Sequence, residues 1–102
     1  MFKNIKKVHF VGIGGIGMSG IAEILFSQGF IVSGSDKSLS EVTDRLQKIG
    51  ITVYEGHSAE NLKDADVLVY SSAVSLDHPE IKAAAARKIP IIKRSEMLAE
   101  TM

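Results

Sequence analysis

The chain has 102 residues, a length typical of one small domain, so we expect a single domain over residues 1–102. Its 12 Lys and Arg balance its 12 Asp and Glu, which argues against a nucleic-acid partner and against a polybasic membrane-surface segment. The absence of Cys excludes disulfide scaffolds, Cys-ligated zinc and thiol nucleophiles. No stretch approaches the roughly 18 apolar residues of a membrane span, and we expect a cytoplasmic protein without a membrane partner.

The chain alternates strand-like apolar runs with helical patterns from one end to the other. In chain order the pattern predicts strand, helix, strand, helix, strand, short helical turn, strand, helix, strand and helix: Lys7–Gly12, Ile16–Gly29, Phe30–Gly34, Ser38–Ile49, Ile51–Tyr54, Ser58–Lys63, Val67–Tyr70, His78–Ala86, Ile91–Ile92 and Ser95–Met102. Such alternation builds βαβ units, so we expect a Rossmann-like, three-layer α/β/α fold with a five-stranded parallel sheet. Ligands of such sheets bind at the carboxyl ends of the strands.

The ends of the predicted helices carry recognisable signals. Gly29 is a natural C-terminal stop for the first helix. Ser38 and Glu41 have the spacing of a capping box, which would open the second helix. His78 stands at the N-cap position of the third helix, directly before a proline in its first turn. The inner face of the second helix is predicted to consist of Val42, Leu46 and Ile49.

A glycine-rich segment lies between the first strand and the first helix. Residues 12–17 match G-x-G-x-x-G in the position where that motif binds a diphosphate. The lack of side chains at Gly14 and Gly15 lets a diphosphate approach the backbone, and the helix N-terminus offers N–H donors. The segment also nearly matches an ATP-binding P-loop, but Met18 stands where the lysine is required, so we exclude ATP as its ligand. A glycine-rich turn without a ligand is the alternative.

Asp36 follows the second strand at about 20 residues from the glycine motif, where a ribose-binding acid occurs in dinucleotide-binding folds. Its alternative role is to cap the next helix. These residues alone predict a site for a nucleotide diphosphate and its ribose. They leave open whether the rest of the ligand is adenine, nicotinamide or uracil. An NAD-binding domain of a dehydrogenase and a non-enzymatic module on the same fold therefore stand as alternatives.

Several motifs along the chain together resemble the Mur ligases. They are the run from His9 to Ala22 and, in order, Ser33–Asp36, Gly56-His57 with Glu60-Asn61, Ser71–Val74, Pro79–Ile81, Ile89–Ile91 and Arg94–Glu100. The resemblance covers essentially the whole chain and is closest to the members that join L-alanine to UDP-N-acetylmuramate. The members that recycle a muramoyl tripeptide are the alternative. The resemblance implies an N-terminal Rossmann-like domain that binds the UDP part of UDP-N-acetylmuramate.

The resemblance also implies which residues hold this substrate. The diphosphate would lie on backbone N–H groups of the glycine loop, while Asp36 and His57 would serve the uridine end. A segment after the fourth strand would line the diphosphate or the sugar. The implied substrate-binding residues are Gly14, Gly15, Ile16, Gly17, Met18, Ser19, Asp36, His57, Ser71, Ser72 and Ala73. Arg94 would reach the muramoyl side, and a solvated surface position suits it equally well.

The Mur ligases activate a carboxylate with ATP, and the resemblance implies ATP and Mg²⁺ as requirements of the whole ligase. It implies that central and C-terminal domains outside this chain bind them and the amino acid. Within the chain we expect no cofactor, no catalytic residue and no metal-ligand cluster, and we expect no amide-bond formation by the chain alone. His9 is expected to be a packed residue of the first strand and not a ligand.

Overall fold

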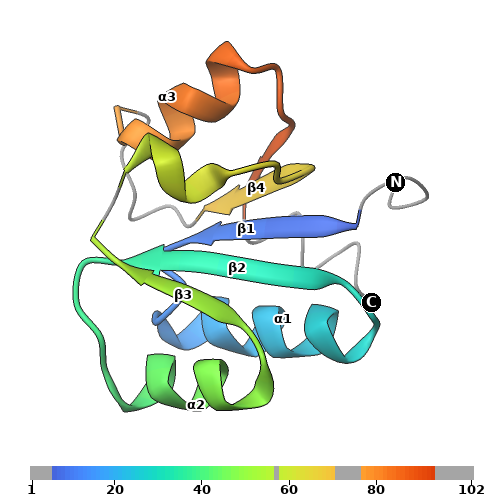
Figure 1. Cartoon of the computed structure of the whole chain (residues 1–102), viewed down its shortest axis with the longest axis vertical. Helices are drawn as coiled ribbons and strands as arrows, with labels where there is room; N and C mark the ends of the chain where they lie inside the picture. Colours follow the sequence, from blue (N-terminus) through green and yellow to red (C-terminus); the bar gives the residue numbers. More distant parts are fainter. Residues whose placement is uncertain (1–5, 57, 71–76, 94–102) are drawn as a thin grey trace.

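Five parallel strands form the centre of the molecule. The computed structural model describes residues 6–56, 58–70 and 77–93 (Figure 1). Every neighbouring pair of strands is parallel, and the order across the sheet is β3-β2-β1-β4-β5. The strands are β1 (Lys7–Val11), β2 (Ile31–Asp36), β3 (Thr52–Glu55), β4 (Val67–Tyr70) and β5 (Ile91–Lys93). The predicted five-stranded parallel sheet is confirmed.

Helices cover both faces of this sheet. On one face lie α1 (Ile16–Ser27) and α2 (Glu41–Ile49). On the other lie the 3₁₀ helix η1 (Ala59–Leu62) and α3 (Pro79–Ala86), as Figure 1 shows. This is the predicted three-layer arrangement, and η1 confirms the short helical turn predicted after the third strand. The helix predicted over Ser95–Met102 lies outside the described residues. Among the described helices, none has the length and apolar character that crossing a membrane requires.

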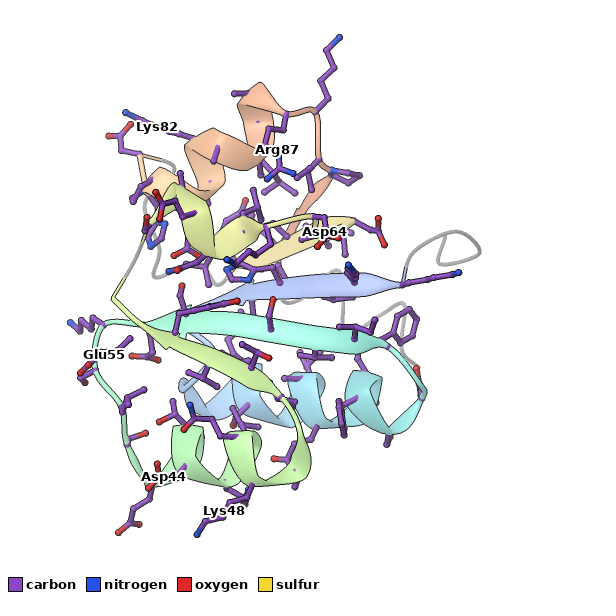
Figure 2. All side chains as sticks on the ribbon, in the orientation of Figure 1. Asp44, Lys48, Glu55, Asp64, Lys82 and Arg87 are labelled. Atoms are coloured by element: carbon purple, nitrogen blue, oxygen red, sulfur yellow. The ribbon has the colours of Figure 1, made fainter. Side chains whose placement is uncertain are left out.

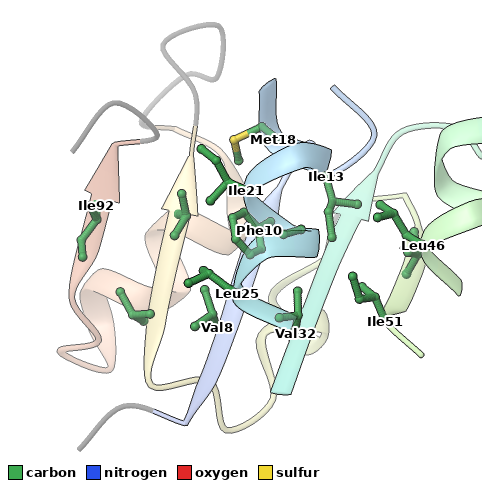
Figure 3. Packing of buried hydrophobic residues seen from close by; sticks show 14 residues of the cluster. Val8, Phe10, Ile13, Met18, Ile21, Leu25, Val32, Leu46, Ile51 and Ile92 are labelled. Atoms are coloured by element: carbon green, nitrogen blue, oxygen red, sulfur yellow. The ribbon is translucent and has the colours of Figure 1, made fainter. Parts of the chain in front are cut away.

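The central strand β1 is buried on both faces. Val8 and Phe10 belong to the larger apolar core, between the sheet and the layer of α1 and α2 (Figure 3). Val11 belongs to a smaller apolar core beneath η1 and α3. His9 alternates with Val8 and Phe10, faces that second layer and is fully buried, which confirms its prediction as a packed residue.

Most charged side chains of the described residues lie on the outside of the molecule. Figure 2 labels acidic and basic residues on the outer surface of both helical layers, among them Asp44 and Lys48 on α2 and Lys82 on α3. Asp44 and Lys48 are four residues apart on one helix, a spacing at which opposite charges are neighbours. Acidic and basic residues are therefore balanced over the whole chain and are also neighbours on α2.

The structure corrects the predicted start of α2. Its N-cap is Ser40, whose Oγ accepts a hydrogen bond from the Thr43 N–H at 3.4 Å. The Oγ1 of Thr43 accepts the Ser40 N–H at 2.7 Å in return. The capping box predicted at Ser38 and Glu41 is therefore wrong by two residues. Thr43 takes the reciprocal role that the pattern reserves for Glu or Gln, so composition alone misplaces the box.

The predicted inner face of α2 is also wrong at one residue. Leu46 is fully buried and Val42 packs against the core, as predicted. Ile49, however, is 41% exposed. The chain turns at Gly50, which has a φ of 117°, and the next residue, Ile51, enters the core instead. A left-handed glycine ends the helix there because it carries no Cβ penalty.

Candidate functional site

The glycine segment is a turn held firmly to the neighbouring strand β2. Gly12 has a φ of 74°, a conformation that favours glycine. The N–H groups of Gly12 and Ile13 both donate to the carbonyl oxygen of Ser35, at 2.8 and 3.0 Å. The Ile13 side chain is fully buried over Gly34, where an added Cβ would lie 2.5 Å from it. The turn is therefore held in place by the backbone of β2 and by the packing of Ile13.

Helix α1 begins on this turn without a side-chain cap. Its N-cap is Gly15, and in the described residues no side chain accepts a hydrogen bond in that role. The first turn of α1 also carries no acidic residue. The N–H groups of a helix's first turn have no partner within the helix, and the helix dipole gives this end a partial positive charge. The arrangement suits a phosphate or diphosphate.

Asp36 is the last residue of β2 and lies against the glycine turn. Its Oδ2 accepts the Gly14 N–H at 2.9 Å, and its Oδ1 accepts the Ser38 N–H at 3.4 Å. A Cβ at Gly14 would lie 2.6 Å from that Oδ2, so glycine is needed there for this contact. The alternative role of Asp36 as helix cap is wrong, because Ser40 caps α2. Its role at the uridine end stays a prediction.

Two residues of the predicted site are buried. Met18 is 2% exposed, and its side chain lies in the larger apolar core (Figure 3). Ser19 is 6% exposed. Met18 therefore offers an anion only its backbone N–H, in the first turn of α1. The side chain at the position of a P-loop lysine points into the core, so the structure supports the exclusion of ATP from this loop.

The direction in which successive strands are added to the sheet reverses at β1, and this reversal indicates where a ligand site is expected. From β1 the chain runs outward through β2 and β3, then returns to add β4 and β5 on the other side. The crevice at such a switch point, between the carboxyl ends of β1 and β4, is where open α/β sheets bind their ligands. The glycine turn leaves β1 at this crevice.

A polar cluster that the sequence analysis missed lies on the other face of β1 and β2. Glu80 of α3 is fully buried, and its carboxylate accepts hydrogen bonds from four described residues. His9 Nε2 and Ser35 Oγ donate to Oε1, at 2.5 and 2.8 Å. The Ser58 N–H and Asn61 Nδ2 donate to Oε2, at 3.1 and 3.2 Å. We call these five residues the Glu80 cluster; they join β1, β2, η1 and α3.

Hydrogen bonds keep the buried carboxyl of Glu80 ionised. Burial by itself raises the pKa of a carboxyl group. The donors from His9, Ser35 and Asn61 outweigh this effect and lower the pKa of Glu80 from 4.5 to about 2. Since the carboxylate only accepts, His9 Nε2 carries the hydrogen that they share. The other ring nitrogen of His9, Nδ1, lies 2.9 Å from the Oγ of Ser33 on β2.

A comparison of the chain with known families decides its affiliation. The profile described as "Mur ligase family, catalytic domain" matches residues 7–102. The chain belongs to the Mur ligase family. The resemblance that its motifs predict is thus confirmed.

Individual Mur ligases match the chain closely over part of their length. The UDP-N-acetylmuramate–L-alanine ligase of Myxococcus xanthus is 59% identical over 100 residues, which cover 98% of this chain and 21% of that protein. A crystal structure of UDP-N-acetylmuramate–alanine ligase from Thermotoga maritima has a TM-score of 0.90 at 44% identity, covering 93% of this chain and 22% of that one.

A second similar structure is that of a ligase with a different name. The UDP-N-acetylmuramate:L-alanyl-gamma-D-glutamyl-meso-diaminopimelate ligase from Neisseria meningitides has a TM-score of 0.84 at 34% identity. The match covers 94% of this chain and 31% of that one. The chain spans about a fifth of the length of the curated Mur ligases that it matches, 21% in the Myxococcus enzyme.

Part of the site predicted for this Mur ligase domain lies outside the described residues. This applies to His57, Ser71, Ser72, Ala73 and Arg94, whose roles stay predictions. Within residues 6–56, 58–70 and 77–93, no group of three or more His, Cys, Asp or Glu is placed to hold a metal ion. In the glycine turn, the buried Met18 side chain stands at the position of a P-loop lysine, which argues against ATP as the ligand there.

Proposed function

We propose that the chain is the UDP-N-acetylmuramate-binding domain of a Mur ligase that joins L-alanine to this peptidoglycan precursor with hydrolysis of ATP. The observation that carries the proposal is the 59% identity, over nearly the whole chain, to the Myxococcus xanthus enzyme of that name. Identity to the Neisseria ligase, whose name specifies a tripeptide substrate, is 34%. This difference favours L-alanine over the tripeptide.

The geometry of the glycine turn supports a diphosphate site. The N–H groups at the start of α1 point to the carboxyl edge, and neither a side-chain cap nor an acidic residue of the first turn competes for them among the described residues. Gly15, the exposed N-cap of α1, adds no side chain on that side. We place the diphosphate of UDP-N-acetylmuramate there, on residues 14–19.

Asp36 supports the uridine end of the proposed site. Its Oδ2 accepts the Gly14 N–H at 2.9 Å, whereas among the described residues Oδ1 accepts a long hydrogen bond of 3.4 Å from the Ser38 N–H. A carboxylate oxygen has lone pairs for a second donor, so Oδ1 can also accept a ribose hydroxyl. We assign the same end of the substrate to His57, and the diphosphate or sugar to Ser71, Ser72 and Ala73.

ATP and Mg²⁺ belong, in this proposal, to parts of the ligase outside the described residues. ATP supplies the free energy of amide-bond formation, and this domain holds and orients the UDP-sugar while the reaction proceeds. The central and C-terminal domains of such a ligase are then the partners of this domain. The precursor is a cytoplasmic nucleotide, so we place the protein in the cytoplasm.

Isothermal titration of the 102-residue chain tests this proposal. We expect UDP-N-acetylmuramate and UDP to bind weakly, and NADH and ATP to give no heat above dilution. Binding of NADH without a response to UDP would overturn the proposal in favour of a dinucleotide-binding domain. Catalysis of ligation by this chain alone, with ATP, Mg²⁺ and L-alanine, would contradict the assignment of the chemistry to other domains.

A chemical-shift map locates the site. In ¹⁵N spectra recorded with increasing UDP-N-acetylmuramate, we expect perturbations at residues 14–19, 36, 57 and 71–73. Shifts gathered at the amino ends of the strands, around Lys7 and Thr52, would refute the assigned site while leaving the family unchanged.

A further inference from the structure

The Glu80 cluster anchors a turn that leaves the sheet at its carboxyl edge. Gly56 and Ser58, on either side of position 57, are each held by a hydrogen bond, and we refer to these two residues as the turn after β3. At its start the Gly56 N–H donates to the carbonyl oxygen of Asp36, at 2.7 Å. At its end the Ser58 N–H donates to Oε2 of Glu80, at 3.1 Å. Asn61 Nδ2 spans both ends, donating to the Gly56 carbonyl at 3.1 Å and to Glu80 at 3.2 Å.

Ser35 connects this cluster to the glycine turn. Its carbonyl oxygen accepts the N–H groups of Gly12 and Ile13, while its Oγ donates to Oε1 of Glu80 at 2.8 Å. His9 reaches the same oxygen from β1, three residues before the turn begins. The carboxylate of Glu80, in the first turn of α3, is thus hydrogen-bonded to the turn after β3 and, through Ser35, linked to the glycine turn.

A buried carboxylate at this position lowers the stability of the fold relative to an apolar side chain, unless its directional hydrogen bonds serve a purpose that an apolar side chain could not. Burying a charge away from water costs more than burying an apolar side chain of the same volume, and apolar replacements are often neutral or stabilising. Hydrogen bonds, however, are directional, and a fully bonded cluster specifies one arrangement of the elements that it joins. Here the elements are those whose ends form the carboxyl edge.

We propose that Glu80 is a positioning residue of the substrate site, an inference that rests on the proposed function. Its carboxylate, held by His9 and Ser35, fixes the turn after β3 relative to the glycine turn. It thereby sets the affinity for UDP-N-acetylmuramate without touching the substrate. His57, which lies between Gly56 and Ser58 in the sequence, is assigned above to the uridine end.

The variant Glu80→Gln tests this role with little change in volume. The amide places two N–H donors where one carboxylate oxygen accepted, so they face either His9 and Ser35 or Ser58 and Asn61. We expect the Kd for UDP-N-acetylmuramate to rise about tenfold or more, because an unpaired buried donor forces the turn to shift. In the unliganded protein, the amide resonances of Gly56 and Ser58 should move as well.

Val8→Ala is the matched control. Val8 precedes His9 on β1, is 1% exposed and faces the opposite layer. This change should lower the free energy of unfolding, yet leave the Kd within about twofold of wild type, because Val8 is the second residue of β1 and packs on the face opposite the cluster. If Val8→Ala weakens binding as much as Glu80→Gln at equal loss of stability, the cluster contributes only stability and the inference is overturned.

Asn61→Ala keeps the inference testable if Glu80→Gln does not fold. This half-buried side chain bonds both ends of the turn, and its loss leaves the bond between His9 and Glu80 in place. We expect a smaller rise in Kd, about threefold, with the same amide resonances affected. An unchanged Kd in folded Asn61→Ala overturns the inference. Failure of the wild-type chain to bind UDP-N-acetylmuramate overturns instead the proposed function.

Discussion

The two faces of the sheet are held to their helices in different ways. Beneath α1 and α2, the described residues form an apolar core of 14 buried side chains (Figure 3). Beneath η1 and α3, the apolar core has six described members, and it is supplemented by His9, Ser35 and Glu80, all fully buried. Successive residues of β1 and β2 point alternately to the two layers, so the same strands serve both.

The contrast teaches how one small domain separates stability from geometry. Apolar contacts are numerous and non-directional, and a core built from them tolerates changes that conserve volume. Hydrogen bonds to a buried carboxylate are few and directional, and one missing partner leaves a polar group unsatisfied. The first face therefore holds most of the buried apolar side chains among the described residues. In our proposal, the second face determines how the segments at the carboxyl edge lie relative to one another.

Leu25→Ala should have the largest effect on stability. Leu25 is fully buried in the last turns of α1, within the larger apolar core. Removing three buried carbon atoms there should lower the free energy of unfolding by about 2–5 kcal/mol, measured by urea denaturation at pH 7. The loss should be the same at pH 5 as at pH 7, because no titrating group is involved. A loss below about 1 kcal/mol would mean that this face is not the main source of stability.

Acid should weaken the second face through Glu80. Its pKa is about 2 in the folded protein and 4.5 when unperturbed, so the unfolded chain binds the proton first as the pH falls. The stabilisation is complete above pH 4.5 and is lost as the pH drops towards 2, an effect of about 3 kcal/mol. Urea denaturation across this range should show it for wild type.

Glu80→Gln isolates this contribution from other carboxylates. Backbone N–H groups of Lys6 and Lys7 also lower the pKa of Asp66, which adds to the acid sensitivity of both proteins equally. The stability difference between wild type and variant should therefore narrow between pH 7 and pH 2. A difference that stays constant with pH would show that Glu80 is not ionised in the fold.

Gly14→Ala should disturb the contact between the glycine turn and Asp36 at the carboxyl edge of the sheet. Its new Cβ would lie 2.6 Å from Asp36 Oδ2 and 3.1 Å from Thr43 Cγ2, so we expect a loss of about 1–3 kcal/mol in stability and of UDP binding. The control is Gly20→Ala, an exposed position on α1 where an added Cβ meets nothing within 4 Å. That change should stabilise the protein by up to about 1 kcal/mol. Equal stability and equal UDP binding of the two variants would show that Gly14 does not lie in close contact with Asp36.

Removal of the α2 cap should have the smallest effect. Ser40→Ala takes away the acceptor of the Thr43 N–H and should cost about 1 kcal/mol, measured by thermal unfolding. Ser38→Ala, two residues earlier, should change the stability by less than about 0.5 kcal/mol. A larger loss of stability in Ser38→Ala than in Ser40→Ala would instead support the capping box predicted from the spacing of Ser38 and Glu41.

The order of elements was predictable because each carries a local pattern, whereas the Glu80 cluster was not. Apolar periodicity and glycine stops locate the strands and helices, and the glycine motif locates the turn after β1. The contact between His9 and Glu80 joins residues 71 positions apart, and no local pattern links them. Asp36 is intermediate: its position was expected, but its bond to the Gly14 N–H depends on how β2 extends beside the turn.

Gly34 bears on how sequence variation in this domain should be interpreted. It lies inside β2 and is not one of the glycines with a positive φ. A Cβ at this position would nevertheless lie 2.5 Å from the Ile13 side chain. Larger residues would expel Ile13 and carry the glycine turn with it. A saturation mutagenesis scan should rank position 34 with the motif glycines, and intolerance there would measure packing against Ile13 rather than ligand chemistry.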